Sequence, residues 1–199
     1  MPITRCAWAG DDPLYHKYHD REWGVPLHTD KKLFEFLVLE GMQAGLSWIT
    51  VLKKRQAFRQ AFDGFDYNVV AGYGKPKINK LLNDAGIIRN RLKINAAVKN
   101  AQAFIRVREE FGTFNKYIWG FVDNTPIQNT WKSMKDLPAK TDLAEQISRD
   151  LKRRGFSFVG PTIVYAHMQA TGMVNDHTRD CFRYKEVKAL AGKSGKGAK

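Results

Sequence analysis

The stretch from Leu151 to Cys181 constrains the fold more than any other part of the chain, because it joins two helical patterns through a short turn. Before the turn, apolar residues recur every four positions on one face of a predicted helix: Leu143, Ile147 and Leu151. Gly155 can adopt the left-handed conformation that ends such a helix, and Pro161 suits the first turn of the next one. We therefore expect two helices joined by a hairpin that ends at Gly160.

This hairpin has two interpretations. The free backbone N–H groups at the start of the second helix can bind a phosphate, as in a helix-hairpin-helix element that holds the DNA backbone without reading its sequence. The same residues are equally compatible with an ordinary corner between two helices. In the first interpretation, the residues expected to contact DNA are Gly155, Gly160 and Thr162.

Two cysteines and two histidines suggest a metal site. His177 and Cys181 are four positions apart, so on a helix they would share a face and could both ligate one ion. Cys6 and His19 supply a second pair within residues 4–26, an irregular segment that needs a tether to keep its shape. Four such ligands leave no open position for a reacting water, which predicts one structural Zn²⁺ per chain that joins the N- and C-terminal segments. A disulfide between the two cysteines is the alternative, although a reducing compartment disfavours it.

Glu40 stands near the end of a predicted helix that begins at Thr29 or Asp30. A carboxylate among apolar residues at a helix C-terminus opposes the helix dipole, which suggests a function. The alternative is an exposed glutamate at a fraying end. The turn that follows leads into a helix with Lys53, Lys54 and Arg55 pointing outward, and spacing alone makes Leu46 a core residue.

The remaining pattern is helical. A long helix is expected from Arg89 to Glu110, with Leu92, Ala96, Ala103 and Val107 on its apolar side and Arg89, Arg91, Lys93 and Lys99 on its exposed side. No sustained alternation with a period of two is present. The fold class expected is therefore all-α, with one compact domain over residues 1–184 and a basic, disordered tail over residues 185–199.

Charge narrows the class of partner. The chain has 33 Lys and Arg against 20 Asp and Glu, a formal net charge of +13, which makes nucleic acid the expected partner. No secretory h-region and no stretch of about twenty apolar residues is present, so we expect a cytoplasmic protein without membrane contact. We also expect a monomer without an obligate protein partner.

Several blocks of sequence resemble the Tag family of 3-methyladenine DNA glycosylases, within the helix-hairpin-helix DNA glycosylase superfamily. They follow the family's order over most of the chain: Tyr18-His19-Asp20, Glu22-Trp23-Gly24-Val25-Pro26, Leu39-Glu40-Gly41, Gln43 to Arg55, Asp84 to Arg89, and Asn175-Asp176-His177.

The resemblance implies a monofunctional glycosylase of base excision repair, which releases N3-methyladenine from alkylated double-stranded DNA and leaves an abasic site. It assigns Glu40 to the reaction, Leu46 to the gap left by the extruded base, and the four Cys and His ligands to a structural zinc. The pocket walls that it implies are Trp8, Tyr15, Tyr18 and Trp48. Taken singly, each of these aromatic residues is better explained by ordinary core packing.

The chain departs from many members of the superfamily after the hairpin, where Asn175 stands in place of a catalytic Asp. Asp176 does not replace it without a shift of register, and no Lys lies between the hairpin and Asp176 to form a Schiff base, so strand cleavage is not expected. The alternative function is a non-enzymatic helical DNA-binding module held together by zinc. A zinc hydrolase would need an open coordination position, which four protein ligands do not leave.

Overall fold

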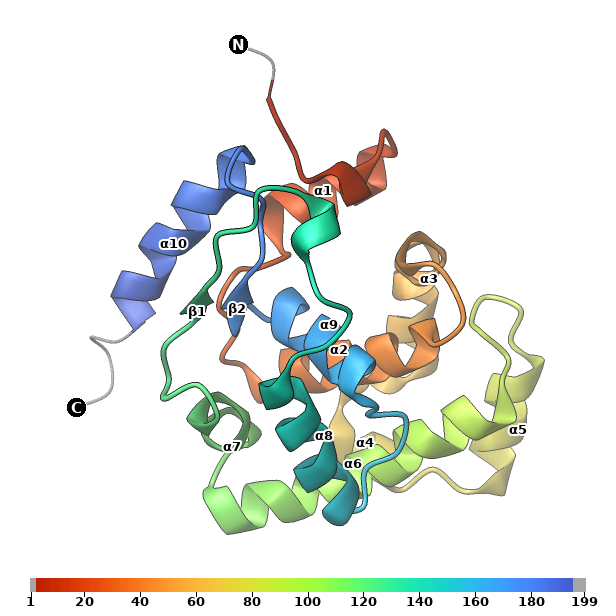
Figure 1. Ribbon diagram of the computed structural model, residues 1–199. Helices are drawn as coiled ribbons and strands as arrows, with labels where there is room; N and C mark the ends of the chain where they lie inside the picture. The colour runs from red at the N-terminus through yellow and green to blue at the C-terminus, as the bar shows by residue number, and fades with distance from the viewer. Residues whose placement is uncertain (1–2, 195–199) are drawn as a thin grey trace.

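Helix α2, Asp30–Gln43, is the element against which other helices pack near the middle of the molecule (Figure 1). The computed structural model describes residues 3–194, and in it all ten residues from Leu33 to Met42 are buried. A helix buried on every side needs partners around its whole circumference. Those partners are α3 (Trp48–Ala61), α6 (Arg91–Phe111), α7 (Phe114–Gly120) and α9 (Pro161–Ala170).

The rest of the described chain is also mostly helical. The other helices are α1 (Pro13–Arg21), α4 (Tyr67–Ala71), α5 (Lys75–Asn83), α8 (Asp142–Arg153) and α10 (Phe182–Ser194), with the 3-10 turns η1 (Ala7–Ala9), η2 (Asp63–Phe65) and η3 (Met134–Asp136). None of the helices within residues 3–194 is long and apolar enough to cross a membrane.

The all-α prediction is right except for one small sheet. Strands β1 (Ile127–Gln128) and β2 (Val174–Asn175) pair in parallel, with Ile127 opposite Val174. Two-residue strands are too short for alternation of apolar and polar residues to reveal them.

The segment after α1 is fastened to the end of α9. The Gly24 N–H donates to the Gln169 carbonyl oxygen (3.0 Å), and the Leu27 N–H donates to the Thr171 carbonyl oxygen (3.0 Å). Gly172, which follows Thr171, has a φ of +72°, and a Cβ there would lie 2.4 Å from the carbonyl carbon of Val25. Only glycine lets the two backbones approach this closely.

Two predictions for the long helix are wrong. Leu92, expected on the apolar side, is 70% exposed. Lys93, expected in solvent, is buried and donates from Nζ to the carbonyl oxygens of Met42 (2.8 Å) and Ala44 (2.6 Å). The last carbonyls of α2 lack partners within their own helix, and the lysine ammonium satisfies them.

The predicted tail also differs from the structure. Helix α10 continues to Ser194, so residues 185–194 are helical where disorder was expected. Val187 is 1% exposed and lies beside Gly24, and this contact holds the helix against the N-terminal segment. The remainder of the predicted tail, residues 195–199, lies outside the described residues.

We predict that Gly172→Ala will destabilise the protein by about 3 kcal/mol or more, because it combines a positive φ with a clash against backbone that cannot move aside. Gly120→Ala is the control, since a Cβ at Gly120 would meet nothing within 4 Å. It should change stability by less than about 1 kcal/mol. Urea unfolding measures both, and equal effects would contradict the close-approach explanation.

Candidate active site

A cavity of about 220 Å³ lies beside the buried part of α2. It brings together all five residues predicted for the reaction and the pocket walls: Trp8, Tyr15, Tyr18, Glu40 and Trp48. Six further residues line the cavity that the sequence did not single out: Trp23, Gln43, Met134, Leu137, Ala166 and Gln169. The cavity therefore combines aromatic faces with one carboxylate and two side-chain amides.

The aromatic walls hold one another in place. The ring of Trp8 meets Tyr15 edge to face with centroids 5.2 Å apart, and it meets Trp23 in the same way at 4.9 Å. Tyr18 continues the wall to Trp48, at a centroid distance of 5.5 Å. Such pairs are favourable beyond their apolar area, so the walls are fixed before any ligand enters.

Glu40 is buried in the cavity wall without a compensating charge. It is 3% exposed, and among residues 3–194 its carboxylate has no hydrogen-bond partner. Burial alone raises the pKa of Glu40 to about 8. The alternative of an exposed residue at a fraying end is wrong, because α2 continues past Glu40 to Gln43.

A second buried carboxylate on the same helix, that of Glu35, has its negative charge compensated by cations. Glu35 is also buried, but its Oε1 accepts from Arg55 Nε (2.7 Å) and from Arg59 Nη2 (2.7 Å). Burial opposes ionisation of Glu35, yet these two guanidinium groups lower its pKa below the usual value. Arg55, predicted to face solvent, is buried because it serves this pair. The chain thus neutralises one buried carboxylate of α2 and leaves the other open to the cavity.

The turn after α2 presents Leu46 to solvent. Leu46 is 43% exposed, so its prediction as a core residue is wrong. Gly45 precedes it with a φ of +78°, and Lys93 holds the backbone of the turn at Ala44. An apolar side chain is therefore held outward on a fixed turn that follows the helix carrying Glu40.

The hairpin between α8 and α9 has the predicted glycine geometry. Gly155 has a φ of +93°, its N–H donates to the Lys152 carbonyl oxygen, and the next N–H donates to the Leu151 carbonyl oxygen, both at 3.0 Å. This pair of bonds is the Schellman ending of a helix. At the other end, a Cβ on Gly160 would meet nothing within 4 Å, and Thr162 is exposed.

Two buried side chains outside the hairpin fix its shape. Asn100 of α6 accepts from the Ser157 N–H (2.7 Å) and donates to the Ser157 carbonyl oxygen (2.9 Å). Ser148 donates to the Val159 carbonyl oxygen (2.6 Å). The sequence offered no signal for either residue, because each contact depends on where distant helices meet.

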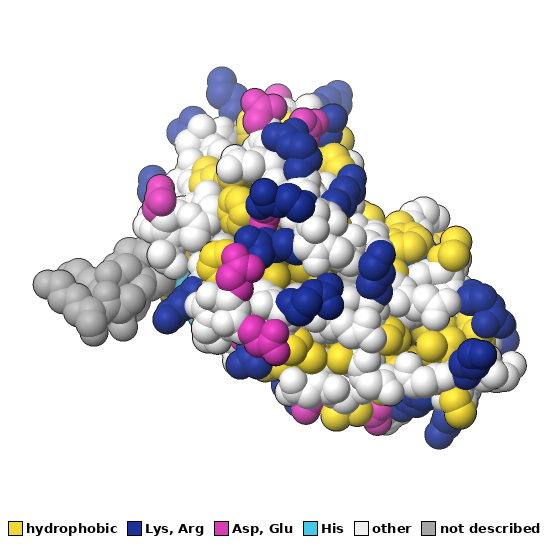
Figure 2. Space-filling model, turned by 90° about the horizontal axis from the view of Figure 1, so that it is seen from below, with side chains coloured by type: hydrophobic (Ala, Val, Ile, Leu, Met, Phe, Trp, Pro, Cys, Tyr) yellow, Lys and Arg dark blue, Asp and Glu magenta, His cyan; other side chains and the backbone are white. Residues whose placement is uncertain are grey.

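The surface around α6 and α8 carries many Lys and Arg side chains with fewer Asp and Glu between them (Figure 2). A hollow of about 700 Å³ lies between α7 and α8, but it contains none of the predicted site residues. Two of its arginines, Arg153 and Arg154, are already paired with Asp150, and Arg154 also pairs with Glu110. This hollow is therefore not a candidate active site, although it is larger than the cavity that contains Glu40.

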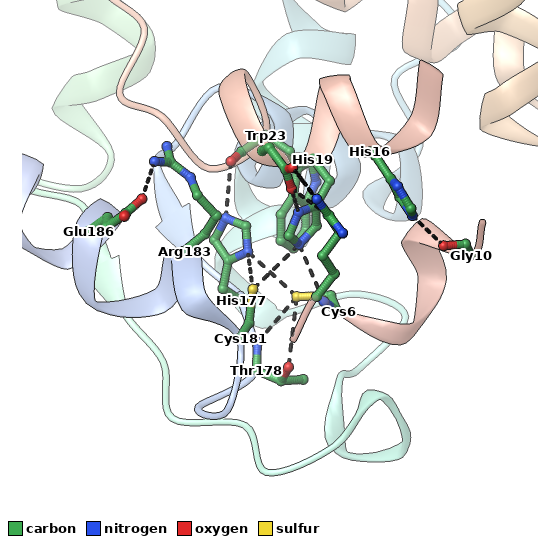
Figure 3. Close-up of polar contacts among 12 residues, drawn as sticks. Cys6, Gly10, His16, His19, Trp23, His177, Thr178, Cys181, Arg183 and Glu186 are labelled. Atoms are coloured by element: carbon green, nitrogen blue, oxygen red, sulfur yellow. Dashed lines mark hydrogen bonds and ion pairs between the residues drawn. The ribbon is translucent and has the colours of Figure 1, made fainter. Parts of the chain in front are cut away.

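The four predicted metal ligands form one buried cluster (Figure 3). Their ligand atoms all lie within 4.8 Å of one another. Cys181 Sγ lies 3.5 Å from His19 Nε2 and 3.5 Å from His177 Nδ1, and Cys6 Sγ lies 3.5 Å from the same His177 atom. The two cysteines are free thiols, so the disulfide alternative is not adopted. The cluster can hold a metal ion.

Neighbouring groups orient both histidine rings. His19 Nδ1 lies 2.8 Å from Asp20 Oδ1, and His177 Nε2 lies 3.1 Å from the Trp23 carbonyl oxygen. These contacts turn His19 Nε2 and His177 Nδ1 toward the cysteines, as outer partners do for metal-bound histidines. Hydrogen bonds from Cys6, His177 and His19 lower the pKa of the Cys181 thiol, which favours the thiolate that a metal needs.

The local structure of the second ligand pair differs from the prediction. His177 and Cys181 lie in a turn before α10, in which the Cys181 N–H donates to the Thr178 carbonyl oxygen (2.9 Å). A turn brings residues four apart together as a helix does, so the ligand set is unaffected. The other histidines lie outside this cluster: His167 is buried in α9, and burial lowers its pKa to about 4.

Asn175 and Asp176 are both buried and engaged with the protein. Asn175 donates to Gln128 Oε1 (3.0 Å) and to the Tyr184 carbonyl oxygen (3.2 Å). Asp176 accepts four hydrogen bonds, among them one from Tyr165 (2.5 Å) and one from Gln169 (2.8 Å). Neither residue lines the cavity.

Comparisons with known proteins agree with this geometry. The family model for methyladenine glycosylase matches residues 8–184. The chain is 47% identical to DNA-3-methyladenine glycosylase 1 of Escherichia coli (strain K12), over 92% of this chain and 97% of that protein. It is 46% identical to DNA-3-methyladenine glycosylase of Haemophilus influenzae, over 89% of this chain and 96% of that protein. A solved structure of a 3-methyladenine DNA glycosylase I variant in complex with 3-methyladenine has a TM-score of 0.88 and 37% identity, covering 90% of this chain and 97% of that one.

We predict that Glu40→Gln will stabilise the protein increasingly as pH rises. A buried acid with a raised pKa costs nothing below its unfolded pKa of about 4.5 and reaches its full cost, on the order of 5 kcal/mol, above about pH 8. Urea unfolding of wild type and variant at pH 5 and pH 8.5 measures the difference. Parallel stability curves for the two proteins would contradict the uncompensated burial of Glu40.

Glu35→Gln is the matched control on the same helix. Because its folded pKa is lowered, Glu35 contributes stability above its unfolded pKa, and that contribution is lost as pH falls through the folded pKa. The variant should therefore be less stable than wild type at pH 7, by about 3 kcal/mol, since Arg55 loses its buried partner.

Proposed function

The chain belongs to the methyladenine glycosylase family, and from that premise we propose that it is a monofunctional DNA glycosylase of base excision repair. It hydrolyses the N-glycosidic bond of N3-methyladenine in alkylated double-stranded DNA, releasing the free base and leaving an abasic site. The observation that carries this proposal is the buried carboxylate of Glu40, which has no hydrogen-bond partner among the described residues and lies in an aromatic cavity.

Charge explains why this cavity suits the damaged base. N3-methyladenine in DNA is cationic, whereas adenine is neutral. A cation beside Glu40 favours the ionised carboxylate and so lowers a pKa that burial has raised to about 8. The faces of Trp8 and Trp48 add attraction for a positive ring. A neutral base provides neither interaction and leaves the burial of Glu40 uncompensated.

The reaction needs little more from the protein than binding. Alkylation at N3 makes the base a good leaving group, and departure of the base passes through a transition state that resembles an oxocarbenium ion. The base must first leave the stack and enter the cavity. Asp176 is saturated with hydrogen bonds, and no lysine lines the cavity, which supports a reaction without strand cleavage. Glu40 is the catalytic residue in this proposal.

DNA would be held by two elements. The open backbone at Gly160 and the N-terminus of α9, with the exposed Thr162, suit a phosphate, and Gly155 allows the hairpin that presents them. Leu46, held outward on its turn, would fill the space left by the extruded base. The basic surface around α6 and α8 supports association with the backbone (Figure 2).

The Cys and His cluster is proposed to hold one structural Zn²⁺. With Zn–S of about 2.3 Å and Zn–N of about 2.0 Å, tetrahedral geometry separates sulfur from nitrogen by about 3.5 Å. The three sulfur to nitrogen distances given above, 3.5 Å each, match that value. Four protein ligands leave no site for a reacting water, so the ion would stabilise the fold and take no part in the reaction.

The test of the function is release of bases from methylated duplex DNA, resolved by chromatography. We predict that wild type releases 3-methyladenine and that Glu40→Gln lowers kcat/KM for this release by about a hundredfold or more, while DNA affinity changes far less. Glu109→Gln makes the same chemical change on the exposed side of α6 and should behave as wild type.

Two outcomes would overturn the proposal. Unchanged release by Glu40→Gln would remove Glu40 from the reaction. Tight DNA binding by the wild type without any release of base would favour the non-enzymatic DNA-binding module.

The test of the metal assignment uses two neighbouring histidines. We predict one zinc per chain by elemental analysis, and a fall in Tm of about 10 °C or more when a chelator removes it. His19→Ala should lose the metal, whereas His16→Ala should retain it, because His16 contacts the Gly10 carbonyl oxygen outside the cluster. Full zinc content in His19→Ala would contradict the ligand set.

A further inference from the structure

The amide of Gln169 has only one orientation available to it. Gln169 Nε2 donates to Asp176 Oδ2 at 2.8 Å, while its Oε1 has no hydrogen-bond partner among residues 3–194. Gln169 lines the same cavity as Glu40. A side-chain amide can usually rotate to exchange its donor and its acceptor, so its use in recognition depends on what fixes it.

Asp176 fixes the orientation of the Gln169 amide, because each carboxylate oxygen of Asp176 already accepts two hydrogen bonds. Oδ1 accepts from Asn129 Nδ2 (2.7 Å) and from the indole N–H of Trp131 (2.8 Å). Oδ2 accepts from the Tyr165 hydroxyl (2.5 Å) as well as from Gln169. Asp176 is completely buried, so no water competes for these positions. A reversed Gln169 amide would put oxygen against oxygen, at a cost that no other contact offsets.

We propose that Gln169 is a specificity-determining residue, whose fixed carbonyl accepts a hydrogen bond from the 6-amino group of the methylated adenine and rejects purines with an oxygen at that position. This inference rests on the proposed function. Apart from Glu40, which is assigned to the reaction, the other polar groups of the cavity discriminate less, because the Gln43 amide has no hydrogen-bond partner among the described residues and tyrosine hydroxyls can either donate or accept. Of the two amides that line the cavity, Gln169 is the one prevented from turning its donor inward.

Asp176 acts as a positioning residue for two sides of the cavity at once. Through Gln169 it fixes the α9 wall, and through Asn129 and Trp131 it fixes the segment that leads into η3. That segment supplies Met134 and Leu137 to the lining. A single buried carboxylate therefore sets both the shape of the cavity and the polarity of one of its amides.

Binding of two free bases tests the proposal, with quenching of tryptophan fluorescence as the readout because Trp8, Trp23 and Trp48 line the cavity. The bases are 3-methyladenine and 3-methylhypoxanthine, which differ at position 6 by an amino group against an oxygen. Wild type should prefer 3-methyladenine. Gln169→Met keeps the side-chain length and removes the acceptor, so the preference should fall by about tenfold.

Gln43→Met is the matched control. It removes from the same cavity an amide that has no hydrogen-bond partner among the described residues, so it should change the affinities for the two bases by similar factors. Equal losses for both bases in Gln169→Met would show that Gln169 only fills space, and would overturn the proposal. Release of 3-methyladenine from DNA by wild type, measured in parallel, separates this failure from a failure of the proposed function.

Asp176→Asn gives the second arm. The introduced side-chain amide would present an N–H to Gln169, allow the Gln169 amide to reverse, and turn its Nε2 into the cavity. The preference should then shift toward 3-methylhypoxanthine, by about tenfold relative to wild type. A folded Asp176→Asn protein with an unchanged preference would overturn the proposal, and Gln169→Met decides the question if this variant does not fold.

Discussion

The structure depends on two buried carboxylates of helix α2, one of which is paired with cations while the other is not. Glu35 is neutralised by Arg55 and Arg59, whereas Glu40, five residues later, has neither cation nor hydrogen-bond donor among the described residues. A protein selected only for stability would not keep the second arrangement, because burial of an unpaired acid is costly. The cost is tolerable where a positively charged ligand supplies the compensating charge that the protein itself lacks. The protein then loses some stability and gains selectivity for that ligand.

Three consecutive residues after Val174 tie that cavity to the rest of the fold. Asn175 joins β2 to Gln128 and to the start of α10, Asp176 fixes Gln169 and the segment before η3, and His177 belongs to the metal cluster. The cluster in turn holds Cys6, from which η1 carries Trp8 into the cavity wall. The Cys and His cluster and the cavity are therefore parts of one connected structure.

Much of this architecture was predictable from sequence, for reasons that differ between residues. The hairpin glycines and the spacing of the Cys and His pairs depend on local backbone geometry, which can be predicted from neighbouring residues in the sequence. Arg55, Lys93 and Leu92 were assigned to the wrong environment, because helical periodicity does not say which distant carbonyl or carboxylate lies beside a face. Gln169 could not be singled out from the sequence, since the orientation of its amide is set by Asp176 and by the partners that surround that carboxylate.

The metal cluster also sets an order of events during synthesis. Cys6 and His177 are 171 positions apart, so one pair of ligands leaves the ribosome long before the other exists. Until then the N-terminal segment has no anchor there, and closing so long a loop carries an entropic cost that a metal bound at the cluster would help to offset. The wall that contains Trp8 is completed only when the last part of the chain arrives. A polypeptide that ends before Cys181 thus lacks a finished cavity, and catalytic competence becomes a property of a chain translated at least that far.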